Sequence, residues 1–158
     1  MLMPQPLWRA LVRPRPLLAF VAALLLTAAW GSLVQTQYNL AALQGLGQPI
    51  DLATRWRTSW QDLLGFGPVY AAIVLAAWLP AFAVVLWLGR RRRVLRAWPL
   101  PLACCLSLIV AIRLIDAFAP MPVLIYATRT LDGLLAMAAG GSLGGLLFLW
   151  LARPVIQR

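Results

Sequence analysis

Four long stretches of this chain carry few or no charged residues, and they constrain its fold more than any other feature. They run from 17 to 34, 69 to 88, 101 to 119 and 131 to 152. Each is close to the ~20 apolar residues that a helix needs to cross the ~30 Å hydrocarbon core of a bilayer. The sequence therefore predicts an all-α membrane protein in which residues 1–158 form a single domain of four antiparallel transmembrane helices.

The arginines are distributed unevenly between the two ends of these spans. All 14 basic residues are Arg and all 4 acidic residues are Asp. Ten arginines precede span one, separate spans two and three, or follow span four, with no Asp among them. Because basic residues are enriched in cytoplasmic loops, we expect the N-terminus, the C-terminus and the 90–96 loop to be cytoplasmic. The predicted location is the bacterial inner (plasma) membrane.

This asymmetry also accounts for the net charge of +10 without a nucleic-acid partner. Basic side chains beside a span attract the anionic headgroups of the cytoplasmic leaflet. Five arginines between spans two and three are therefore predicted to contact anionic lipid: Arg90, Arg91, Arg92, Arg93 and Arg96.

The segment 35–66 is the longest connection between spans. Within it Leu52, Trp56, Trp60 and Leu63 recur at helical spacing with polar residues between them, a pattern typical of a helix lying in the membrane interface. Asp51 precedes this run, where a short acidic side chain can cap the first free N–H groups of a helix. We therefore expect an interfacial helix between spans one and two.

A spacing of Arg and Asp three residues apart occurs twice, as Arg113 with Asp116 and as Arg129 with Asp132. Residues three apart share a helix face, so each Arg could pair with its own Asp. Charged residues inside a membrane are costly and are candidates for function. The two pairs are predicted to form a charge cluster, which either clamps spans three and four together or lines a cavity.

Span four carries a stripe of small residues that includes two overlapping G-x-x-x-G patterns. Membrane helices pack by close backbone approach, which glycine permits. Span four is therefore predicted to be a contact helix, its partner being another span or another subunit. The predicted packing residues are Gly133, Gly140, Gly141, Gly144 and Gly145.

The absence of His, Glu and Lys restricts the chemistry that the chain can perform. It removes the usual general base, the commonest metal ligand and any Schiff-base lysine, so we expect no enzyme activity, no cofactor and no metal site. We predict an accessory or scaffolding subunit that packs against a membrane-protein partner or its own copies through span four and the segment 35–66. A small oligomeric transporter or channel with the charge cluster at its outer mouth is the alternative, and a lipid- or quinone-processing enzyme is a weaker one.

Overall fold

The computed structural model describes residues 14–91, 99–118 and 125–156. These residues form four long α-helices and one short 3-10 helix, and all four α-helices are long and apolar enough to cross a membrane. The all-helical class predicted from the sequence is confirmed. The elements are α2 (Pro14–Gly45), α3 (Leu52–Arg91), α4 (Leu100–Phe118), η2 (Tyr126–Arg129) and α5 (Leu131–Ile156).

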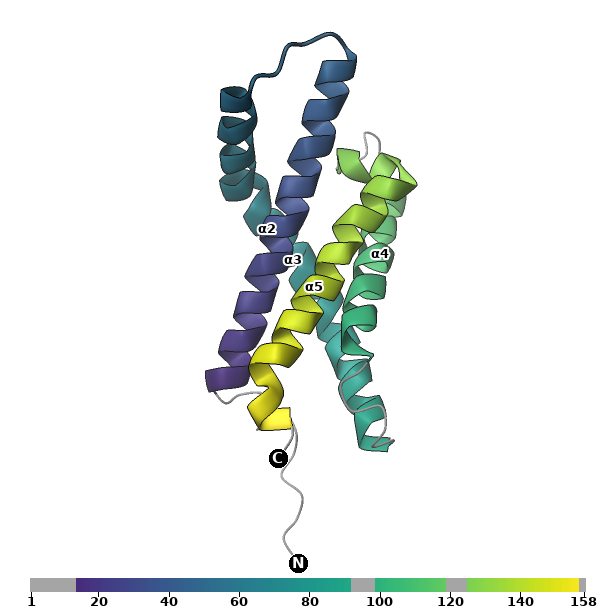
Figure 1. Ribbon diagram of the computed structural model, residues 1–158. Helices are drawn as coiled ribbons and strands as arrows, with labels where there is room; N and C mark the ends of the chain where they lie inside the picture. The colour runs from purple at the N-terminus through teal and green to yellow at the C-terminus, as the bar shows by residue number, and fades with distance from the viewer. Residues whose placement is uncertain (1–13, 92–98, 119–124, 157–158) are drawn as a thin grey trace, which may run out of the picture.

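Helix α5 packs against both α2 and α4, and α3 crosses behind them (Figure 1). Helix α2 begins and α5 ends at the same end of the bundle, which we call the terminal end. At the opposite end, the hairpin end, α2 passes into α3 and η2 precedes α5.

The α2–α3 hairpin is much longer than the other two helices. Helices α2 and α3 contain 32 and 40 residues, whereas α4 has 19 and α5 has 26. At 1.5 Å per residue these lengths are about 48, 60, 28 and 39 Å. The hairpin consequently extends past α4 and α5, as Figure 1 shows.

The turn at the tip of the hairpin follows from glycine chemistry. Gly47 has a φ of 84°, a left-handed conformation that glycine adopts without steric cost. Gln48 N–H donates to the Leu43 carbonyl at 3.1 Å and Gly47 N–H to the Gln44 carbonyl at 3.0 Å. These two bonds form a Schellman motif, which ends α2 and turns the chain toward α3.

The structure does not contain the separate interfacial helix expected between spans one and two. Residues 35–45 continue α2, and residues 52–66 are the first turns of α3, continuous with the second span. Pro68 and Pro80 lie inside α3 without ending it. Proline removes a backbone donor and crowds the preceding turn, which bends a helix, and α3 changes direction along its course in Figure 1.

The terminal half of the bundle is filled by aromatic side chains around Trp78, which is fully buried. Phe20 meets Trp78 edge-on with ring centroids 6.0 Å apart, and Phe82 meets Phe148 edge-on at 5.0 Å. Such edge-to-face geometry is favoured by the ring quadrupoles. Helices α2, α3 and α5 are therefore joined here by apolar packing.

Candidate functional site: the polar hairpin end

Polar side chains concentrate at the hairpin end, where four consecutive residues of α2 contact three neighbouring elements, η2, α3 and α5. Gln35 Oε1 accepts the Ala127 N–H of η2 at 2.9 Å, and Thr36 Oγ1 donates to Asp62 Oδ2 of α3 at 2.8 Å. Successive helical residues point about 100° apart, so a polar run in sequence distributes its hydrogen bonds around the helix.

Two further residues of the same run complete these contacts. Tyr38 OH donates to Asp132 Oδ2 of α5 at 2.6 Å, and Gln37 Nε2 donates to Ser59 Oγ of α3 at 3.2 Å. We call Gln35, Thr36, Gln37 and Tyr38 with their partners the polar collar. It joins α2 to all the elements that surround it at this end except α4.

Arg55 extends the polar collar toward the tip of the hairpin. Its guanidinium donates through Nη1 to Gln37 Oε1 and through Nη2 to Gln44 Oε1, the latter at 3.3 Å. Asp51 caps α3, because its Oδ1 accepts the Thr54 N–H at 2.8 Å. Hydrogen bonds from the Thr54 hydroxyl and amide hold the pKa of Asp51 below its ordinary value. The predicted capping role of Asp51 is thus observed.

The four residues of the predicted charge cluster do not form local Arg–Asp pairs among the described residues. Asp132 accepts from Tyr38, and Asp116 Oδ2 accepts from Thr128 Oγ1 at 3.1 Å. The Arg129 guanidinium lies 4.9 Å from the centre of the Tyr126 ring. The carboxylates therefore bind hydroxyl groups of neighbouring elements.

Arg113 is exposed on α4, and within the described ranges no acceptor or aromatic ring is bonded to it. Asp116 is half-buried and bonds to Thr128 of η2, so it does not pair with Arg113. Among the described residues, Arg113 is consequently a cation without a bonded partner near the hairpin end of a span.

The five predicted packing glycines are all buried, and they face three neighbouring elements of the same chain, α2, α4 and η2. A Cβ on Gly140 would lie 2.5 Å from Trp30 of α2, and one on Gly144 would lie 3.0 Å from the Ala23 carbonyl. Because Gly140 and Gly144 share a face, this G-x-x-x-G pattern holds α2.

The second pattern faces α4. A Cβ on Gly141 would lie 2.8 Å from the Cys104 carbonyl oxygen, and one on Gly145 would lie 2.8 Å from Pro101 Cα. A Cβ on Gly133 would lie closer still to the Ala127 carbonyl oxygen of η2. Both glycine faces of α5 are therefore occupied by elements of this chain.

Two polar contacts between α2 and α5 had no signal in the sequence. Thr27 Oγ1 donates to the Gly140 carbonyl at 3.1 Å, and Trp30 Nε1 donates to the Ala136 carbonyl at 2.8 Å. Backbone carbonyls inside a helix normally accept a hydrogen bond from their own helix. The small residues of α5 let α2 come close enough for its side chains to donate a second one.

Several buried polar atoms of the described residues lack a hydrogen-bond partner. They are Ser32 Oγ, Tyr70 Oη, Trp78 Nε1 and Asp116 Oδ1. Tyr70 packs its ring directly on Gly31, where any side chain would overlap it.

The predicted anionic-lipid arginines are only partly covered by the structure. Arg90 and Arg91 are in the last turn of α3, where only the backbone is described, and Arg92, Arg93 and Arg96 lie outside the described residues. Cys104 and Cys105 are free, Cys104 being buried. In the described ranges, no group of three or more His, Cys, Asp or Glu residues could hold a metal ion.

No protein-family model, no curated protein and no solved structure matches this chain. The class of the protein therefore follows from its own geometry. Four apolar helices that are each long enough to cross a bilayer make it a multi-pass integral membrane protein.

Proposed function

We propose that this protein is a non-catalytic accessory or scaffolding subunit of the bacterial inner membrane, with both termini in the cytoplasm and the hairpin end outside. The orientation is supported by the ten arginines without Asp at the terminal end and the balance of four Arg and four Asp at the hairpin end. The partner-binding surface that we propose is the exposed apolar face of the first turns of α3.

The observation that carries the proposal is that the first turns of α3 turn polar side chains toward α2 and leave apolar side chains exposed. Ser59 is buried against α2, and the Arg55 and Asp62 side chains also bond to α2. The opposite face carries four large apolar side chains four residues apart. Leu52, Trp56, Trp60 and Leu64 are 74%, 77%, 64% and 65% exposed.

The depth of this apolar face argues for a protein partner. Asp62 bonds to Thr36, two residues before Tyr38, which itself bonds to the start of α5. Asp62 therefore lies close to the membrane boundary. Leu52 is ten residues earlier, about 15 Å further out along the helix. The headgroup layer is only ~5–8 Å thick on each side, so lipid covers the lower part of the stripe and leaves the upper part without an apolar partner.

Of the two contact regions that the sequence suggests, this proposal keeps the segment 35–66 and sets span four aside. The glycines of α5 are already used by α2, α4 and η2. The interior also favours a scaffold over a transporter. Trp78, Phe82 and Phe148 fill the terminal half of the bundle between the described helices, where a permeation path would need polar or hydrated walls.

The test is purification of the tagged, full-length protein from its native membrane in mild detergent. We expect a second membrane protein to co-elute stoichiometrically with the wild type, and to be lost from the double variant Trp56→Ser/Trp60→Ser. Trp150→Ser is the matched control, because Trp150 is also exposed, at 62%, but lies near the end of α5. Co-elution that survives the double variant would refute the assigned surface, and a wild type that always elutes alone would refute the accessory role.

A further inference from the structure

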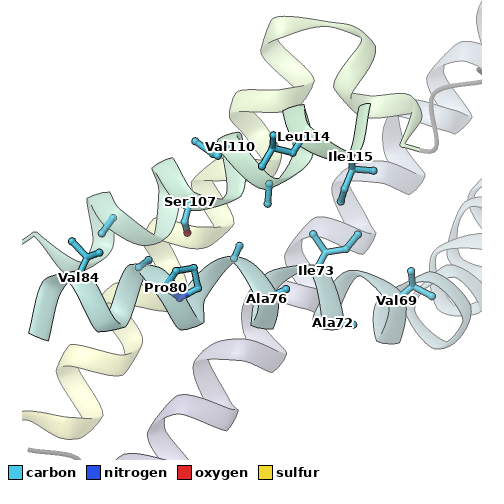
Figure 2. Close-up of a pocket in the computed structure, with 14 residues that line it drawn as sticks. Val69, Ala72, Ile73, Ala76, Pro80, Val84, Ser107, Val110, Leu114 and Ile115 are labelled. Atoms are coloured by element: carbon cyan, nitrogen blue, oxygen red, sulfur yellow. The ribbon is translucent and has the colours of Figure 1, made fainter. Parts of the chain in front are cut away.

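A groove of about 840 Å³ opens between α3 and α4. Figure 2 shows its two walls, with Val69 and Ile115 at one end and Val84 at the other. Small side chains of α3 leave space between the two helices there, among them Ala72, Ala76 and Ala81. Its walls are almost entirely apolar.

The dimensions of the groove suit a lipid tail. Val69 and Val84 are fifteen residues apart on α3, which corresponds to about 22 Å along the helix axis. One leaflet of the ~30 Å hydrocarbon core is ~15 Å deep, so an acyl chain entering at the hairpin end would run along most of the groove. The Ser107 hydroxyl donates its proton to the Cys104 carbonyl at 2.9 Å, so it is not a free donor for a polar ligand in the groove.

Arg113 lies beside the hairpin end of the groove. This residue follows the groove residue Val110 by three positions and precedes Leu114, so it lies on the adjacent face of α4. Arg113 is five residues before the end of α4 at Phe118, about 7 Å below it. An exposed guanidinium at that depth, bonded to no described side chain, extends toward the nearest layer of phosphates.

We propose that the groove between α3 and α4 binds an anionic phospholipid, with one acyl chain between the helices and its phosphate on Arg113. The guanidinium offers the planar set of donors that binds a phosphate bidentately. This site does not depend on the partner surface proposed above, which lies on the first turns of α3.

A partner helix fits the observations less well than a lipid. A helix in the groove would bring apolar side chains against α3 and α4 but would leave the Arg113 charge without an anion in a poorly hydrated place. A phospholipid supplies both an apolar chain for the groove and an anion for Arg113, and it is abundant at this depth.

The test uses native mass spectrometry of the full-length protein in detergent, titrated with phosphatidylglycerol or with phosphatidylcholine of the same acyl chains. We expect one tightly bound phosphatidylglycerol and weaker binding of phosphatidylcholine. Arg113→Gln should weaken phosphatidylglycerol binding roughly tenfold or more, as expected for a lost hydrogen bond to a charged group. Arg113→Lys keeps the charge but loses the bidentate donor set, so its affinity should lie between those of the wild type and Arg113→Gln.

Matched controls separate the site from general charge and volume effects. Ala76→Leu fills the groove and should weaken phosphatidylglycerol binding, whereas Ala139→Leu adds the same volume on an exposed part of α5 and should not. Arg57→Gln removes an exposed charge from the hairpin and should leave binding unchanged. Wild-type affinity in folded Arg113→Gln, equal binding of both lipids, or protection of the groove by a second polypeptide would each overturn the proposal.

Discussion

Replacing Gly145 by Ala should destabilise the bundle, although alanine is the better helix former. The new Cβ would lie 2.8 Å from Pro101 Cα and 3.2 Å from Pro101 N, both backbone atoms of α4. Carbon atoms in contact prefer ~3.5–4.0 Å, so α4 and α5 must separate by roughly 0.7 Å or more. Overpacking of this kind costs about 1–3 kcal/mol, which exceeds the gain of about 0.5–1 kcal/mol from removing a helical glycine.

The assay is unfolding in mixed micelles, followed by circular dichroism as the fraction of denaturing detergent is raised. Gly65→Ala is the matched control, because it lies inside α3 and a Cβ there meets nothing within 4 Å. We expect Gly65→Ala to be neutral or stabilising and Gly145→Ala to be less stable than it by about 1–3 kcal/mol. Equal stability of the two variants would refute the close approach of α4 and α5.

Three further predictions concern hydrogen bonds of α2 and α3. Trp30→Phe keeps the packing but removes the donor to Ala136, so it should cost about 1 kcal/mol in the same assay, and no loss would mean that the bond contributes nothing. Tyr38→Phe and Asp132→Asn should each destabilise, and the double variant should lose less than the two losses added together, whereas strict additivity would contradict their contact. Asp51→Ala should be less stable than the wild type at neutral pH. The pKa of Asp51 is lowered by folding, so its contribution is complete above the unfolded value of ~3.9 and disappears as the pH falls through the folded value. The two proteins should therefore converge in acid, and a difference that persists there would refute the capping argument.

The spans themselves could be predicted from the sequence because the requirement is local. A helix in lipid must be apolar along its whole length, so hydropathy alone identifies the four stretches, and each lies within or within one residue of an observed helix. The extension of α2 through residues 35–45 was not predicted. Its polar residues read as a loop because their hydrogen-bond partners come from distant parts of the chain, Asp132 being 94 residues from Tyr38.

The same reason explains which parts of the candidate site were missed. A spacing of three residues predicts a local pair, but Asp116 and Asp132 bond to Thr128 and Tyr38, which only the tertiary structure brings near them. The glycines of span four could be identified as packing residues from composition. Their division between α2 and α4 depends on where those helices lie, and no local pattern encodes that.

The most direct test of the account is photo-crosslinking in the native membrane from a photoreactive amino acid placed at position 60 of α3 or position 146 of α5. Both native residues, Trp60 and Leu146, are exposed, at 64% and 54%. If α3 carries the partner surface and α5 is occupied within the chain, position 60 should give a discrete protein adduct and position 146 only lipid adducts. A protein adduct from position 146 with none from position 60 would contradict the assignment.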